Sequence, residues 1–144
     1  MTPYKQLYRH DPDKGIYGDC WRTCYACLLD IPPYAVPHPF ADSDNLDRGW
    51  AIMRRFMEGK GYGIYTAAYQ MSDIEEFLNF QAVLNPGITM IMLGQSKNLV
   101  GHCVLIKDGI ILHDPSLDNS GIIGPLDGHF HIELLVPLSK RRSV

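Results

Sequence analysis

The sequence predicts an α+β fold in which helices near the N-terminus pack on an antiparallel sheet of about four to six strands. Two observations predict this class. Helical patterns dominate the first half of the chain, whereas apolar strand patterns gather in the second half. These strands lack the regular alternation with helices that is typical of a parallel sheet. The length of 144 residues fits one domain, so we expect residues 1–144 to form a single unit.

The first predicted helix begins after Asp19, a residue type that often caps helix N-termini, and runs to Asp30. A proline pair just beyond ends it, because proline cannot continue a helix. Before the helix, residues 1–18 carry prolines, glycines and charges, and we expect an irregular arm. After it, residues 32–46 are rich in Pro, Asp and Asn, which predicts a long loop.

The remaining elements follow from apolar periodicity, capping residues and turn residues. Ser72 opens a capping box, which predicts the start of a short helix. The elements expected after the first helix are, in order, a helix at 47–59, a strand at 62–67, a helix from about 73 to 80, and strands at 88–93, 101–106, 110–114 and 130–136. A polar loop covers 115–129, and we expect residues 140–144 to be a flexible tail.

The hairpin near residue 108 allows two registers. A two-residue turn at Asp108-Gly109 would place the side chains of His102 and Asp114 on opposite faces of the sheet. A three-residue turn that begins one residue earlier would place His102 directly opposite Asp114. We predict the three-residue turn, because it brings an imidazole and a carboxylate together.

Composition and charge disfavour several classes of protein. The chain is 46% hydrophobic and 20% charged, as globular domains are, which argues against intrinsic disorder. Its net charge of -3 gives no field that would favour nucleic acid or an anionic membrane as a partner. We find no stretch apolar enough to span a bilayer and no signal-peptide pattern. We therefore expect a cytoplasmic protein whose four cysteines are reduced.

Three residues far apart in the sequence form a candidate catalytic set. Cys20 lies at a predicted helix N-terminus, where backbone N–H groups stabilise a thiolate, the nucleophilic form of the thiol. His102 is the candidate general base, and Asp114 is the candidate for orienting its ring. Each alone has an ordinary alternative, namely a packing cysteine, a core histidine and an Asp-Pro turn. Together, in this order, they favour a thiol hydrolase.

Two further residues are candidates for supporting roles. The side-chain amide of Gln6 could donate to an oxyanion, although a glutamine in an irregular arm is more often an ordinary surface residue. Trp21 follows Cys20 directly, and it could shield the sulfur and contact the substrate, or simply pack in the core.

The candidate residues lie in three short stretches, Gly18-Asp19-Cys20-Trp21, Gly101-His102-Cys103-Val104 and His113-Asp114-Pro115-Ser116. In order and local sequence these stretches resemble the papain-like cysteine peptidase superfamily, and most of all the small bacterial type that processes double-glycine bacteriocin leaders. The resemblance implies a papain-like fold, a peptide or protein substrate and no cofactor. It also implies a set of roles: nucleophile Cys20, base His102, orienting residue Asp114 and oxyanion donor Gln6.

The position of Gln6 departs from the pattern of that superfamily. Its members usually carry the oxyanion glutamine about half a dozen residues before the cysteine. In this chain Lys14 occupies that position and Gln6 lies much further upstream. For Gln6 to reach the sulfur of Cys20, residues 7–18 would have to loop out.

The function that we expect is hydrolysis of a peptide, isopeptide or other amide bond through a thioester intermediate. Acyl transfer and deamidation use the same Cys-His chemistry, so they stay open as alternatives. A non-catalytic binding module could keep the same fold and cleft. The sequence does not indicate an oligomeric state.

A zinc-binding protein is the last alternative. Cys24 and Cys27 would share one helix face, and His129 and His131 would share one strand face, but no second pair completes a tetrahedral set. The Cys-x3-Cys-x2-Cys spacing that begins at Cys20 also matches radical iron–sulfur enzymes. Those enzymes carry the motif on a loop of a barrel, which needs a longer chain than this one. We therefore expect no metal or cofactor, and packing roles for Cys24 and Cys27.

Overall fold

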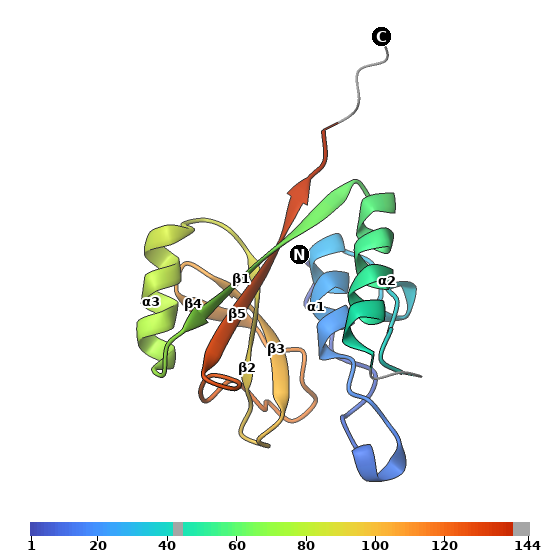
Figure 1. The fold of residues 1–144 in the computed structure, drawn as a ribbon, viewed down its shortest axis with the longest axis horizontal. Helices are drawn as coiled ribbons and strands as arrows, with labels where there is room; N and C mark the ends of the chain where they lie inside the picture. Colours follow the sequence, from blue (N-terminus) through green and yellow to red (C-terminus); the bar gives the residue numbers. More distant parts are fainter. Residues whose placement is uncertain (42–44, 140–144) are drawn as a thin grey trace.

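A computed structural model describes residues 1–41 and 45–139, and it confirms the α+β class (Figure 1). The helices and strands are α1 (Cys20–Leu29), α2 (Leu46–Gly59), β1 (Tyr62–Gln70), α3 (Ile74–Leu84), β2 (Met90–Gln95), β3 (Gly101–Lys107), β4 (Ile110–His113) and β5 (His129–Pro137). The tail expected at 140–144 and part of the loop expected at 32–46 lie outside the described residues. No helix in the described ranges combines the length and the apolar character needed to cross a membrane.

The predicted elements are all present, and the largest differences are in their lengths. Strand β1 runs to Gln70 because it pairs with β5 along its whole length, from Tyr62 opposite Pro137 to Gln70 opposite His129. Helix α3 begins where expected, since the side chain of Asp73 accepts a hydrogen bond from a backbone N–H of the first turn. It runs four residues past the expected end, to just before the Asn-Pro-Gly turn.

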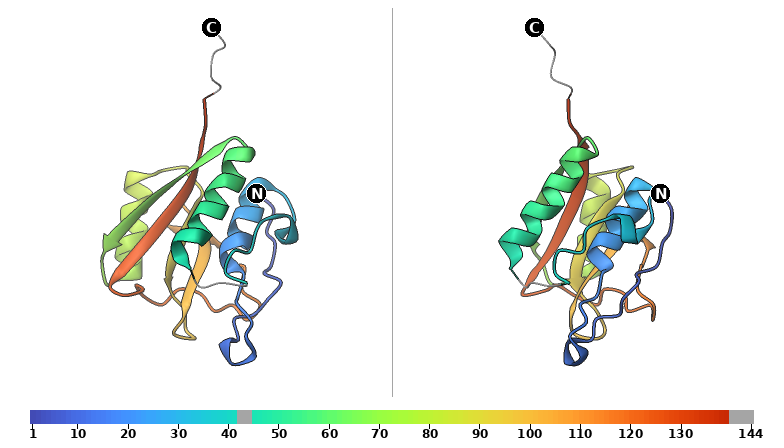
Figure 2. Two further views of the ribbon diagram at one scale, coloured as in Figure 1. Left: turned by 45° about the vertical axis from the view of Figure 1, so that its right-hand side comes forward. Right: turned by 90° about the vertical axis from the view of Figure 1, so that its right-hand side faces the viewer.

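The five strands form one antiparallel sheet in the order β1-β5-β2-β3-β4. Helices α1 and α2 cover one face and α3 covers the other, which gives three layers (Figures 1 and 2). Each face has its own apolar core. The core under α1 and α2 includes Cys24, Tyr25, Cys27, Met53, Met57, Ile91, Cys103 and Leu105. The core under α3 includes Phe77, Met90, Met92, Val104, Ile106, Phe130 and Ile132.

The turn of the β3–β4 hairpin differs from the prediction. Asp108 and Gly109 both have positive φ angles, 51° and 80°, and the residues on either side of them pair with each other. This is a two-residue turn, so the predicted three-residue turn is wrong. The physical reason is that Asp-Gly readily adopts two consecutive left-handed conformations, which match the twist of the paired strands.

A β-bulge in the same hairpin changes which face of the sheet Asp114 shares with His102. It lies between Leu105 and Ile106 and adds one residue on β4, so that Leu105 pairs with His113. Without the bulge, the tight turn would send His102 and Asp114 to opposite faces. With it, the two side chains return to one face, although they are not directly opposite each other as predicted. The bulge therefore has the effect that we expected from the turn.

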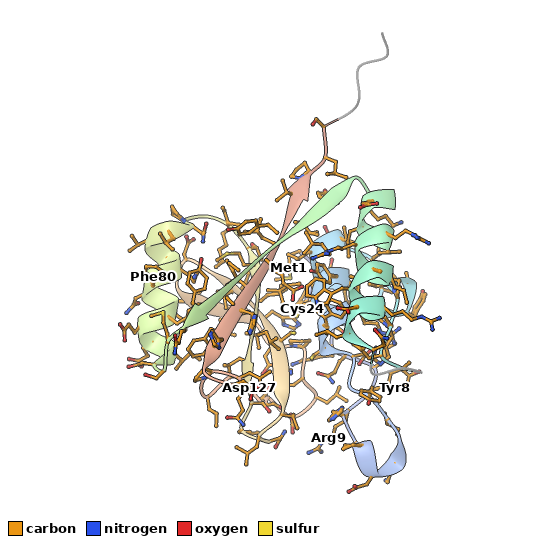
Figure 3. The ribbon with its side chains drawn as sticks, in the orientation of Figure 1. Met1, Tyr8, Arg9, Cys24, Phe80 and Asp127 are labelled. Carbon is orange, nitrogen blue, oxygen red and sulfur yellow. The ribbon has the colours of Figure 1, made fainter. Side chains whose placement is uncertain are left out.

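The N-terminal arm, residues 1–18, contains only a short 3-10 helix, Pro12–Lys14, and its first residues are firmly attached to the body. The backbone N–H of Thr2 donates to the carbonyl of Cys27, and that of Gln6 donates to the carbonyl of Pro115 at 2.8 Å. The ammonium of Lys5 donates to two carbonyls of the loop after β4, at 2.8 and 2.9 Å. Beyond Tyr8 the chain loops out and returns at α1, as Figures 1 and 3 show.

Candidate active site

The start of α1 positions the sulfur of Cys20. We expected the carboxylate of Asp19 to cap this helix, and that expectation is wrong, because the side chain makes no capping hydrogen bond. Asp19 is fully buried and accepts instead from the backbone N–H groups of Leu7 and Tyr8 and from the guanidinium of Arg22. Its charge thus anchors the arm, and the first N–H groups of α1 receive no bond from this side chain.

His102 and Asp114 are in direct contact. The Nε2 atom of His102 lies 2.7 Å from Oδ1 of Asp114. His102 is 5% exposed and lies near the start of β3, whereas Asp114 directly follows β4. The carboxylate of Asp114 also accepts from the backbone N–H groups of Ser116 and Gly121, at 2.9 and 2.8 Å. These bonds fix the carboxylate, and the contact through Nε2 leaves Nδ1 of the ring as the nitrogen free to act on a neighbour.

The environment of Asp114 keeps it ionised. Burial would raise the pKa of Asp114, but the hydrogen bonds from His102, Ser116 and Gly121 outweigh burial and hold that pKa well below its usual range. For His102 burial acts in the opposite direction and would lower the pKa. The interactions with Asp114 and Cys20 outweigh burial and raise the pKa of His102 to about 9. The ring of His102 is therefore held in its protonated form at neutral pH.

The thiol of Cys20 meets His102 and the neighbouring thiol of Cys103. Its interaction with Cys103 is the largest influence on its pKa, followed by burial, which opposes it, and then by His102. The sum holds the pKa of Cys20 well below its ordinary value. The pKa of Cys103 is raised, because its thiol keeps its proton in the interaction with Cys20. A thiolate beside an imidazolium is the reactive state of a cysteine nucleophile.

Gln6 lies in the same pocket as the catalytic candidates. This pocket, which we call the polar pocket, has a volume of about 340 Å³, and its walls include Gln6, Cys20 and His102. The amide of Gln6 donates one hydrogen bond to the carbonyl of Tyr8, at 2.6 Å. Its second N–H is available to another acceptor. Residues 7–18 loop out between Gln6 and Cys20, which is the arrangement that the long spacing required.

Trp21 lies on the other side of Cys20. Its ring packs against Phe40 and Trp50, with ring centres 5.5 and 5.0 Å away, and its indole N–H donates to Glu133 at 2.8 Å. These residues line a second pocket of about 260 Å³, which we call the aromatic pocket, and Cys20 borders it too. The expected packing role of Trp21 is thus confirmed, and the same ring forms a wall of the aromatic pocket.

Sequence reasoning missed two residues at this site, Cys103 and Glu133. Cys103 directly follows His102, and the alternation of a strand sends neighbouring side chains in different directions, which hid its closeness to Cys20. Glu133 is the one acidic residue inside the apolar pattern of β5 and is 5% exposed. A charge at a position that the pattern predicts to be buried was the signal that could have found it.

The residues considered for a metal site are arranged as follows. Cys24 and Cys27 are fully buried in the core under α1 and α2, and all four cysteines are free thiols. The rings of His129 and His131 lie 6.3 Å apart on β5. Within residues 1–41 and 45–139, His, Cys, Asp and Glu form no group of three or more that could share a metal ion.

Comparison of the chain with models of protein families, with curated proteins and with solved structures found no match.

Proposed function

We propose that the protein is a papain-like cysteine hydrolase that cleaves a peptide, isopeptide or other amide bond through a thioester intermediate. The observation that carries this proposal is the row of Cys20, His102 and Asp114. In it, a thiol with a lowered pKa stands at a helix N-terminus beside an imidazole that a carboxylate holds at 2.7 Å. This is the pattern of nucleophile, base and orienting group that covalent hydrolases use on unrelated folds.

Each step of the reaction has a group to perform it. The thiolate of Cys20 attacks the carbonyl carbon of the substrate, and the carbonyl oxygen becomes an oxyanion. The backbone N–H of Cys20 and the free N–H of the Gln6 amide stabilise that charge. His102 gives its proton to the leaving amine as the C–N bond breaks, which leaves a thioester on Cys20. His102 then takes a proton from water, which attacks the thioester and releases the acid and the thiolate.

The free thiols of the four cysteines support a reducing cellular compartment as the place where the protein acts. All four are free, and the mechanism needs Cys20 reduced. We therefore include a reducing compartment such as the cytoplasm in the proposal.

The proposal is tested by comparing wild-type protein with Cys20→Ala. A mixed library of peptides is incubated with each protein, and cleavage products are identified by mass spectrometry. We expect the wild-type protein to cleave peptides. In Cys20→Ala we expect the rate of cleavage to fall by at least about a thousandfold, because the nucleophile is absent. Cys27→Ala is the matched control, since it makes the same change on the same helix and borders neither pocket.

Alkylation of the protein by iodoacetamide near pH 6 gives a readout that does not need the right substrate. We expect Cys20 to be labelled much faster than Cys24, Cys27 or Cys103, because only its pKa is lowered. Equal labelling of all four thiols, or undiminished cleavage by Cys20→Ala, would contradict the proposal.

A further inference from the structure

The aromatic pocket borders the sulfur of Cys20 but has no role in the reaction described above. Its walls are formed mainly by large apolar side chains from the N-terminal arm, α1, the loop before α2, α2 itself and β2. These are Tyr17, Trp21, Phe40, Leu46, Trp50 and Leu93. The two tryptophans are the only ones in the chain. A pocket of about 260 Å³ directly beside a nucleophile is suited to hold one side chain of a bound substrate.

One charged side chain belongs to this otherwise apolar pocket. Glu133, on β5, lines the aromatic pocket and is only 5% exposed. Its Oε1 atom accepts hydrogen bonds from the indole N–H of Trp21 and the hydroxyl of Tyr25. Its Oε2 atom accepts none from the described residues. Burial raises the pKa of Glu133, as expected for a carboxyl group with one oxygen unpaired in an apolar environment, so this position favours a cationic partner from outside the chain.

Arg54, the cation whose charge acts on Glu133, does not supply that partner. The guanidinium of Arg54, on α2, is attracted to Glu133 but forms no ion pair with it in the described part of the chain. It lies instead over the ring of Trp50, 5.2 Å from the ring centre. The aromatic wall thus already attracts a cation, as the faces of tryptophan rings do.

We propose that the aromatic pocket is a specificity subsite that binds a primary ammonium group of the substrate, carried on an aliphatic chain such as a lysine side chain. The aliphatic part packs against the wall that Trp21 and Trp50 form, and the ammonium donates to Oε2 of Glu133. A single free oxygen suits an ammonium, which binds as a point charge, better than a guanidinium, which favours two carboxylate oxygens at once. This inference rests on the proposed cysteine hydrolase function for its meaning, but its first test does not.

The first test measures binding without catalysis. Cys20→Ala protein is titrated with n-pentylammonium chloride and, separately, with 1-pentanol, which has the same chain and no charge. Tryptophan fluorescence reports occupancy, since both tryptophans line the pocket. We expect saturable binding of the ammonium, about tenfold tighter than that of the alcohol. Equal affinity for the two probes, or no saturable signal from the ammonium, would overturn the subsite.

A variant then assigns the effect to one residue. Glu133→Gln keeps the oxygen that accepts from Trp21 and Tyr25 but replaces the free oxygen with an N–H donor. We expect the tenfold preference for the ammonium to disappear. Glu76→Gln, an identical change at an exposed position of α3, should keep the preference. A preference that survives in Glu133→Gln would contradict the assignment. The comparison of the two probes in protein with native Glu133 stands even if this variant folds poorly.

A second test uses cleavage and separates the two proposals. Paired peptides carry either lysine or norleucine at each position near the bond that is cut. We expect kcat/KM to be about tenfold higher for lysine at one position, and this ratio to approach one in Glu133→Gln. Ammonium binding with no cleavage of any peptide would keep the subsite and count against the hydrolase. Cleavage without ammonium binding or a preference for lysine would keep the hydrolase and overturn the subsite.

Discussion

At the scale of single residues, the site depends on charges that stabilise one another. Asp114 is held as an anion by two backbone N–H groups and by His102. Against the effect of burial, that anion and Cys20 together raise the pKa of His102 to about 9, and the resulting imidazolium helps to lower the pKa of Cys20. A change at any of the three residues should therefore appear in the ionisation of the others.

Cleavage should depend on pH through this pair. In the proposed mechanism the productive state has Cys20 ionised and His102 protonated. Since the pKa of Cys20 is lowered and that of His102 is raised to about 9, the productive state exists between the two values. We expect kcat/KM for a cleaved peptide to be level around neutral pH and to fall as pH rises through about 9. A profile that keeps rising above pH 9 would contradict this ionisation scheme.

Asp114→Asn tests the origin of the raised pKa of His102. Asparagine can still hydrogen-bond the ring, but it removes the negative charge that favours the imidazolium. We expect the alkaline limit of kcat/KM to move to lower pH, and the rate of Cys20 alkylation near pH 6 to fall. Asp127→Asn is the matched control, because Asp127 is exposed and lines neither pocket. An unchanged alkaline limit in Asp114→Asn would contradict the role assigned to this carboxylate.

Gln6→Ala tests the proposed role of Gln6 as an oxyanion donor. Loss of one such donor typically lowers kcat by about a hundredfold to a thousandfold. We expect a loss of that size in kcat with little change in the rate at which iodoacetamide labels Cys20, because alkylation forms no oxyanion. A loss in both rates to the same extent would indicate that Gln6 supports the structure of the site instead.

At the scale of elements, the N-terminal arm and α1 form the site together. The buried carboxylate of Asp19 joins them, because it accepts from two N–H groups of the arm and pairs with Arg22. This carboxylate directly precedes Cys20, the proposed nucleophile, yet its charge is balanced by Arg22. The same bonds hold Gln6 beside Cys20 despite the long segment between them.

Asp19→Ala should therefore affect both stability and activity. It leaves the guanidinium of Arg22 and two N–H groups buried without their partner, which costs about 3–5 kcal/mol for a buried charge pair. We expect the free energy of unfolding in urea to fall by about that amount, and kcat to fall as Gln6 loses its position. Asp11→Ala, in the exposed part of the arm, should change stability by less than about 0.5 kcal/mol. Similar stabilities for the two variants would contradict the anchoring role.

At the scale of the whole molecule, much of the fold could be predicted from the sequence. Apolar periodicity and the prolines and glycines between elements located the α-helices and strands of the described residues, because these signals are local, but not the 3-10 turns at Pro12–Lys14 and Pro33–Ala35. The register of the β3–β4 hairpin could not be predicted, since Asp108-Gly109 fits more than one turn and a bulge further along decides the outcome. The contact of His102 with Asp114 was thus predicted, but through the wrong turn.

At the candidate site, too, local features could be predicted from the sequence, whereas contacts between distant segments could not. Cys20 could be recognised because a helix N-terminus is a local feature. The partners of Asp19 and the neighbours of Glu133 come from distant segments, and only the packed structure brings them together. Residue type alone favoured an exposed Gln6, whereas it is 8% exposed and held against the body.

The ionisation of Cys20 tests the central claim most directly. Thiolate absorbance near 240 nm is recorded from pH 4 to 10 for the wild-type protein, and the curve of Cys20→Ala is subtracted. We predict that a thiolate is already present at pH 6, and that His102→Ala moves its appearance to higher pH. A difference curve with a single rise near pH 8.5, the ordinary value for cysteine, would contradict the account.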